Sequence, residues 1–433
     1  MCPLQLRFAL AGLCILSQSA LLVAQANESL TTEQQRLVMT SAWQNLNEPL
    51  YDSNFSIAEF WQSFDGQLML PELSHSAEVA NIADAFLNDP NRNAVVNRLQ
   101  HLNRLSDEDW PELAFVANHR LHSRHSQISL IKQRLVLLGD LAQQDELNDL
   151  YDDALLSALK GFQQRHGLVS DGVIGHQTLA QLNRSPNERR QRLARDYLSR
   201  IYLQAHLPAN YVLVNIADYS IALSLEGEIK FQGKTVVGKP QRPTPLMQTS
   251  IKSLIYNPTW TVPGKLVSRD ILPKAMQDNR YLEQQGFQIR DAKGNLLESS
   301  AIDWTDVTDL DLPLRFTQQP GPNNALGKVK FFLNNERAIY LHDTPNQHHF
   351  KHPQRAYSSG CVRVENAQQL ASIIGASDFV NAAEYSEVHH SDKANHWLAL
   401  STPLPLYTVY LTSSVERGSL PRFQPDIYNF YTN

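Results

Sequence analysis

One cysteine is the strongest candidate for chemistry in this sequence. The chain has three cysteines, and only Cys361 lies outside the first 14 residues. A thiol attacks acyl groups as the thiolate, so it needs a nearby base or a lowered pKa. His342 ends an alternating apolar run before Cys361, and histidine is the usual base at neutral pH. A lone cysteine can also be an inert buried residue, so the neighbours of Cys361 must decide between the two interpretations.

Those neighbours lie in two short stretches, Ala338–Pro345 and Ala356–Arg363. Gly360 permits close approach of the backbone to a substrate. Tyr340, two positions before His342, faces the same side of a strand. The residues after Cys361 are predicted to form a helix. Free N–H groups at its start would stabilise the thiolate and hold an oxyanion.

This pattern resembles the catalytic motif of L,D-transpeptidases: a histidine, a loop, and then Ser/Thr-x-Gly-Cys-x-Arg/Asn. The resemblance covers about residues 211–375. It implies that Cys361 is the acyl-enzyme nucleophile, activated by His342, and that Arg363 positions a substrate carboxylate or orients the site. Ser359 and Gly360 would shape a loop whose N–H groups form the oxyanion hole, with Tyr340 assisting. Many members have His-Gly-Cys where this chain has Ser-Gly-Cys, which leaves His342 as the sole base.

Other polar and aromatic residues have two interpretations each. Asp343 either orients His342 or caps the following turn. Arg363 can equally be a structural ion-pair partner. Trp260 lines the cleft or is a core tryptophan.

Three histidines on one loop, His348, His349 and His352, suggest a metal site at first sight. No cysteine or carboxylate set surrounds them in the sequence, which favours a solvated loop. We therefore expect no metal and no organic cofactor.

Length, charge and the N-terminus restrict the class of protein. A chain of 433 residues is long enough for two or three domains, and its net charge of −6 comes without a basic stripe, which argues against a nucleic-acid partner. Arg7, an apolar run over residues 8–24 and the small-x-small pattern ending at Ala26 predict a signal peptide, residues 1–26. Cleavage after Ala26 would place the protein in the periplasm with no membrane span; an uncleaved anchor is the alternative.

The remaining chain divides by its periodicity. Residues 27–125 are predicted to be a helical scaffold, residues 185–210 a connecting helix, and residues 211–390 a β-rich catalytic domain with a capping insertion at about 265–326. Residues 391–433 would pack on the scaffold or on the catalytic domain. Residues 126–184 resemble a three-helix peptidoglycan-binding module. The residues that match it are apolar helix positions and turn residues at fixed spacing: Leu135, Leu138, Gly139, Ala158, Phe162, Gln163, His166, Gly167, Leu168, Asp171, Gly172, Ile174, Gly175, Thr178 and Leu179.

The expected fold is therefore α+β: a capped L,D-transpeptidase domain, a peptidoglycan-binding module and a helical scaffold. The resemblance implies a carbapenem-sensitive enzyme that joins stem peptides by 3–3 cross-links and releases D-Ala, with peptidoglycan and other cell-wall enzymes as partners. Water or a lipoprotein lysine as acceptor would instead give an L,D-carboxypeptidase or an anchoring enzyme. A non-catalytic wall-binding protein is the third alternative.

Overall fold

The computed structural model describes residues 84–86, 88–115, 119–143, 147–278, 280–302, 304, 314–389 and 391–431. The predicted signal peptide and most of the predicted scaffold lie outside these residues. The chain forms two compact units, Met1–Leu207 with Leu411–Asp426 and Phe430–Asn433, and Pro208–Tyr410 with Ile427–Asn429. Among the helices described, none has the length and apolar character to cross a membrane.

The first unit contains a module of three helices, α6 (Ser126–Leu138), α7 (Asp153–Arg165) and α8 (His176–Asn183). The Asp152 side chain accepts a hydrogen bond from the backbone at the start of α7, and Gly139 ends α6 in the left-handed region at φ 87°. Apolar residues from all three helices share one buried cluster. The glycine and the cap therefore set the lengths of helices whose inner faces form the core.

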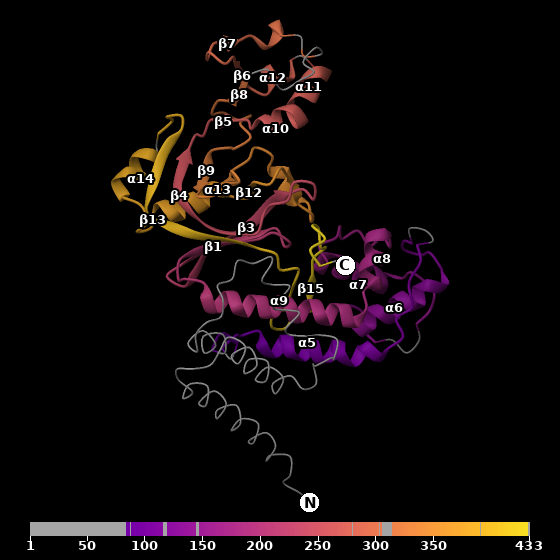
Figure 1. Ribbon diagram of the computed structural model, residues 1–433. Coiled ribbons are helices and arrows are strands. Elements are labelled where there is room, and N and C mark those ends of the chain that lie inside the picture. The colour runs from indigo at the N-terminus through magenta and orange to yellow at the C-terminus, as the bar shows by residue number, and fades with distance from the viewer. Residues whose placement is uncertain are drawn as a thin grey trace, which may run out of the picture. The chain divides into compact units, whose positions relative to one another are not determined.

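Helix α9 (Pro186–His206) follows and runs beside α5 (Arg92–Arg104) (Figure 1). The Ser185 and Glu188 side chains form a capping box at its start, with Pro186 in the first turn. A short 3-10 helix, η2 (Leu105–Asp107), ends the α5 segment, and the pair β14 (Ser413–Ser414) and β15 (Arg422–Phe423) also belongs to this unit.

The second unit is built on a mixed nine-stranded sheet in the order β11-β3-β12-β10-β9-β4-β13-β1-β2. Strand β2 also pairs with β3, so the sheet closes on itself. The strands are β1 (Tyr211–Asn215), β2 (Ser220–Leu225), β3 (Glu228–Gly238), β4 (Met247–Tyr256), β9 (Val329–Leu333), β10 (Leu341–His342), β11 (Ala356–Ser358), β12 (Val362–Val364) and β13 (His396–Val409).

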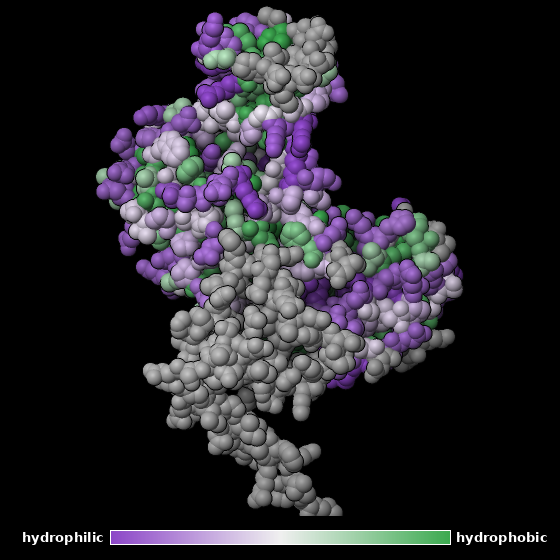
Figure 2. Space-filling view, in the orientation of Figure 1, coloured by the Kyte–Doolittle hydropathy of each residue, from purple (hydrophilic) through white to green (hydrophobic). Residues whose placement is uncertain are grey.

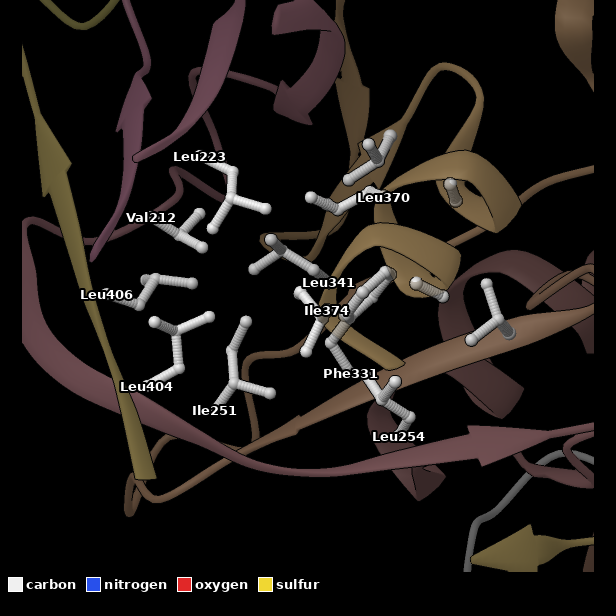
Figure 3. Close-up of a cluster of buried hydrophobic side chains, with 14 of the residues drawn as sticks. Val212, Leu223, Ile251, Leu254, Phe331, Leu341, Leu370, Ile374, Leu404 and Leu406 are labelled. Carbon is white, nitrogen blue, oxygen red and sulfur yellow. The ribbon is translucent and has the colours of Figure 1, made fainter. Parts of the chain in front are cut away.

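One face of this sheet carries the core. Apolar residues from its strands, among them Val212, Ile251 and Phe331, pack against Leu370 and Ile374 of helix α13 (Ala367–Gly375) (Figure 3). Helix α14 (Ala382–His389) adds to the same cluster. We call the opposite face of the sheet the outer face. Because side chains alternate along a strand, every second residue points to the outer face.

A capping subdomain interrupts the chain between β4 and β9 and has a cluster of its own, including Ile271, Phe287 and Phe316. The sequence predicted an insertion here but not its four-stranded sheet, and the subdomain begins at Trp260, before the expected residue 265. Its surface mixes hydrophilic and hydrophobic side chains (Figure 2). Its elements are β5 (Trp260–Thr261), α10 (Gly264–Leu266), η3 (Val267–Ile271), α11 (Leu272–Gln277), α12 (Tyr281–Gln284), β6 (Phe287–Arg290), β7 (Leu296–Leu297), η4 (Ser299–Ala301) and β8 (Arg315–Gln318).

The predicted end of the catalytic domain at residue 390 is wrong. Strand β13 lies inside the sheet, antiparallel to β4 and parallel to β1. Residues 396–409 are therefore part of the domain rather than a segment packed on it. Farther along, the backbone N–H and hydroxyl of Thr412 bond to Asp196 of α9, so only this later part packs on the helical unit.

Candidate active site

The candidate residues meet on the outer face through the register of three strands. Leu341 pairs with Val362 and with Phe331, and all three point into the core. His342 pairs with Arg363 on β12 and with Lys330 on β9. These three basic residues therefore form one row across the outer face, which we call the basic row.

Cys361 precedes β12 by one residue, opposite Tyr340, and its side chain is partly exposed. Its thiol donates a long hydrogen bond, 3.9 Å, to the carbonyl of Ala338. Burial raises the pKa of the thiol above its ordinary value. The N–H and hydroxyl of Tyr340, then the charges of Lys330 and Arg363, act in the opposite direction.

The prediction that Cys361 begins a helix is wrong. Residues Val362–Val364 form strand β12, and α13 starts only at Ala367. The thiolate therefore gains nothing from a helix N-terminus. Tyr340, Lys330 and Arg363 are the groups that favour its charge.

His342 is buried and neutral. Its Nδ1 lies 2.5 Å from the main-chain carbonyl of Asp343, and the main chain of Ala325 also acts on the ring. Because the close Asp343 carbonyl can only accept, we assign the proton to Nδ1 and the lone pair to Nε2. Burial, and then the charge of Arg363, lower its pKa to about 3. Among the described residues His342 makes no hydrogen bond to Cys361; register places the two on one face, in diagonal positions on β10 and beside β12. The carboxylate of Asp343 accepts from Lys328 N–H at 2.9 Å, so only its carbonyl orients the imidazole.

Arg363 has no carboxylate partner among the described residues. Its Nη1 lies 3.3 Å from Nδ1 of His349, and its Nε is buried without a hydrogen bond. The described residues thus give no support to the interpretation of Arg363 as a structural ion-pair partner. A guanidinium held in this way can accept a carboxylate from a ligand.

The loop before Cys361 is shaped by Gly360 together with Thr244 and Ser358, two residues that the sequence did not single out. Gly360 adopts φ 115°, a conformation that side chains rarely tolerate, and its carbonyl accepts from the buried Thr244 hydroxyl at 2.8 Å. The Ser358 hydroxyl donates to the Cys361 carbonyl and accepts from Gly360 N–H. Ser359 was predicted to shape the loop; its hydroxyl is exposed and accepts from Arg242 at 2.9 Å.

Trp260 and Tyr340 link the capping subdomain to the site. Trp260 packs at the edge of the subdomain cluster and contacts Phe287 at 6.3 Å between ring centres. Its indole also acts on the Tyr340 hydroxyl and lowers the phenol pKa, which burial and Cys361 raise. The indole Nε1 lacks the geometry of a full hydrogen bond. Trp260 thus packs on the core of the subdomain, and its role as a cleft-lining residue stays a prediction.

The three loop histidines lie in or beside a short helix, η5 (Gln347–Lys351). His349 contacts the ring of Tyr357, and His352 Nδ1 lies 2.8 Å from the Tyr357 hydroxyl. Within the described part of the chain, no group of three or more histidines, cysteines or acidic residues is arranged to hold a metal ion.

Lys330 is the functional candidate that the sequence did not reveal. It alternates with Val329 and Phe331 in an apolar strand, and such a polar residue looks like an ordinary solvent-facing one. Only its pairing with His342, in a strand distant in sequence, brings it to the site. The site thus combines a thiol, a neutral imidazole and two cations without carboxylate partners.

Residues 209–381 match the model of the L,D-transpeptidase catalytic domain (YkuD), and residues 124–182 match the model described as "Putative peptidoglycan binding domain". A Haemophilus influenzae protein named "Putative L,D-transpeptidase" is 35% identical over 225 residues, which are 51% of this chain and 44% of that protein. The aligned region thus spans less than half the length of that relative.

Solved structures give weak similarity. An L,D-transpeptidase from Xylanimonas cellulosilytica is 13% identical, with 69% of this chain and 100% of that chain covered at a TM-score of 0.21. One from Mycobacterium smegmatis is also 13% identical, with 46% and 58% covered at a TM-score of 0.22. The family matches confirm the resemblance inferred from the motif and the expected α+β class. The chain therefore carries an L,D-transpeptidase catalytic domain at residues 209–381, preceded by a peptidoglycan-binding domain at residues 124–182.

Proposed function

We propose that this protein is a peptidoglycan L,D-transpeptidase that forms 3–3 cross-links between stem peptides. One observation carries the proposal: Cys361, His342 and the unpaired Arg363 share the outer face of adjacent strands inside a catalytic domain of this family. The donor is a tetrapeptide stem, and the acceptor is the side-chain amine of another stem.

In the first half of the reaction, Cys361 gives its proton to the lone pair on Nε2 of His342 and its sulfur attacks the carbonyl carbon of the third stem residue. The new C–S bond displaces the carbonyl electrons onto oxygen, where the Tyr340 hydroxyl and loop N–H groups can stabilise them. When the carbonyl re-forms, the C–N bond to D-Ala breaks and its amine takes the proton from His342. Arg363 holds a carboxylate of the donor.

In the second half, the amine of the acceptor stem attacks the thioester. The new C–N bond forms, the C–S bond breaks, and the proton from the amine returns to sulfur through His342. His342 is neutral before the attack, so its lone pair is free to take the proton, and burial disfavours the charged imidazolium. The chemistry requires no metal and no cofactor, and a carbapenem would acylate the same sulfur.

The peptidoglycan-binding domain suggests that the substrate is the wall itself, with other cell-wall enzymes as partners. The N-terminal residues suggest export to the periplasm, with signal cleavage after Ala26.

The test uses purified disaccharide-tetrapeptide and mass spectrometry of the products. We expect the wild-type protein to yield a dimer with loss of D-Ala, and Cys361→Ala to yield none. His342→Ala should lose most of the rate while its circular dichroism spectrum is unchanged. Full cross-linking by Cys361→Ala would contradict the proposal. Tripeptide without dimer would indicate an L,D-carboxypeptidase, and retained sacculus binding without any product would indicate a wall-binding protein.

A further inference from the structure

Lys330 lies in the middle of a row of paired positions that crosses five strands. Arg363, His342, Lys330, Ile255 and Trp397 are each paired with the next in this order. All five side chains therefore point to the outer face. A partly buried lysine in a central strand is costly unless something offsets its charge. No carboxylate of the described residues lies within ion-pair distance of it.

The nearest partner of the Lys330 ammonium is an aromatic ring. Its Nζ lies 4.0 Å from the ring centre of Tyr340, within the range of a cation–π contact. The N–H and hydroxyl of Tyr340 act on the Cys361 thiol, and the charges of Lys330 and Cys361 influence each other directly. A continuous set of contacts thus leads from the ammonium through the phenol to the sulfur.

We propose that Lys330 is a positioning residue for Cys361, which supplies the positive charge that stabilises the thiolate and the oxyanion of the acyl intermediates, in part through Tyr340. A cation over the face of a phenol withdraws electron density and makes its hydroxyl a stronger hydrogen-bond donor. A charge in a partly desolvated site also acts more strongly than it would in water. Lys330 therefore takes the role that a helix N-terminus would have had. The inference rests on the proposed role of Cys361 as nucleophile.

Few groups around Lys330 change their charge over the pH range in which thiol alkylation is measured. His342 of β10 and Tyr340, just before that strand, face it, Arg363 lies beyond them on β12, and Ile255 of β4 is apolar. His342 is neutral above about pH 3, Arg363 stays charged, and the pKa of Tyr340 is raised by burial. The pH profile of thiol alkylation between pH 6 and pH 10, an interval of about four units, therefore reports Cys361 and its coupling to Lys330.

The experiment compares iodoacetamide labelling of Cys361, followed by peptide mass spectrometry, in four forms of the full chain. We expect Lys330→Met to move the alkylation profile upward by about one pH unit and to slow labelling at pH 8 about tenfold. Lys330→Arg should stay near the wild-type profile because it keeps the charge. Lys252→Met, which removes an exposed lysine from the adjacent strand β4, should coincide with wild type. Labelling needs no stem peptide, so its result is independent of whether the protein cross-links peptidoglycan.

A folded Lys330→Met protein whose profile coincides with wild type would overturn the inference. Lys330→Gln provides a second uncharged variant in case the first does not fold. If neither uncharged variant folds, Lys330→Arg decides. A pH profile of alkylation within about half a pH unit of wild type supports the inference, and a larger shift in the folded Lys330→Arg protein overturns it. A purely structural role for Lys330 would change the unfolding temperature in all variants without moving the profile.

Discussion

Two basic side chains of the helical unit, Arg165 and Arg200, are paired with carboxylates, whereas Lys330 and Arg363 beside Cys361 have no carboxylate partner among the described residues. Arg165 bonds to Asp140 through two nitrogens, and their side chains are 10% and 3% exposed. Arg200 bonds in the same way to the fully buried Asp89. A buried ion is tolerated when its charge and its hydrogen bonds are satisfied within the protein.

Lys330 and Arg363 have the opposite arrangement. Their nearest polar or aromatic partners are a tyrosine ring and a histidine, and Nε of Arg363 makes no hydrogen bond. Leaving such groups unsatisfied costs stability, and the cost is understandable if an anion that forms or binds during the reaction satisfies them. An unsatisfied nitrogen alone does not mark such a cation, because Nε of Arg134 and Nη1 of Arg192 in the helical unit also lack a hydrogen bond among the described residues. Lys330 and Arg363 differ from these in lying on the outer face beside Cys361.

The largest effect on stability is expected from breaking a satisfied buried pair. Asp140→Asn leaves Arg165 without its carboxylate, and Arg98 and Arg189 also lose a nearby negative charge. We expect the free energy of unfolding of this unit to fall by about 3 kcal/mol. Urea titration followed by circular dichroism would measure it, and Cys361 labelling by iodoacetamide should not change.

The matched control is an exposed pair in the other unit. Glu228 and Lys230 form an ion pair with side chains 74% and 40% exposed. Glu228→Gln should leave the urea midpoint unchanged, because solvent already screens this pair. A midpoint as low in Glu228→Gln as in Asp140→Asn would remove the distinction between buried and exposed pairs.

The second effect separates function from stability at Arg363. Arg363→Met removes a partly buried guanidinium that has no carboxylate partner among the described residues, so the unfolding temperature should stay the same or rise. The rate of cross-linking should fall about 10- to 100-fold, which corresponds to the loss of one or two hydrogen bonds to a charged group. Muropeptide assays and thermal unfolding measure the two quantities. A large fall in unfolding temperature, with the rate per folded molecule unchanged, would instead make Arg363 a structural residue.

The sequence predicted those features of the site that depend on local order. Cys361 and His342 stand in a recognisable motif, and Gly360 has the positive φ that only glycine adopts easily. The peptidoglycan-binding module was also recognisable, because Gly139 marks a helix end directly after the apolar face that it terminates.

Features that depend on long-range pairing were not predictable from one sequence. The position of Lys330 follows from register with His342, and β13 enters the sheet between two strands that precede it by well over a hundred residues. The error after Cys361 has a local cause. Val364, Ala367 and Leu370 are spaced as on a helix, and the last two do lie in α13. Val364 instead belongs to β12, because residues 362–364 pair with β3 and β10.

The smallest effect is expected at an ion pair that shares features of both kinds of cation: it has a carboxylate partner, and it also lies beside the Cys361 loop. Arg242 bonds to Asp270 of the capping subdomain, with side chains 17% and 34% exposed, and the same guanidinium donates to Ser359 beside the Cys361 loop. A pair this exposed is worth about 1 kcal/mol or less, so Asp270→Asn should reduce cross-linking about two- to fivefold. Glu283→Gln, an exposed acid elsewhere in the subdomain, is the control.

The dependence of activity on ionic strength tests whether the charge of the Arg242–Asp270 pair matters. Raising ionic strength screens partly exposed charges, so wild-type activity should fall toward that of Asp270→Asn, which itself should respond less. Exchanging the two residues, with Arg242→Asp and Asp270→Arg in one chain, should restore part of the rate if the pair acts by joining the subdomain to the sheet. If the exchanged form stays as slow as Arg242→Asp alone, then the donor to Ser359 is what matters, and Arg242 belongs with Lys330 and Arg363 rather than with the paired cations of the helical unit.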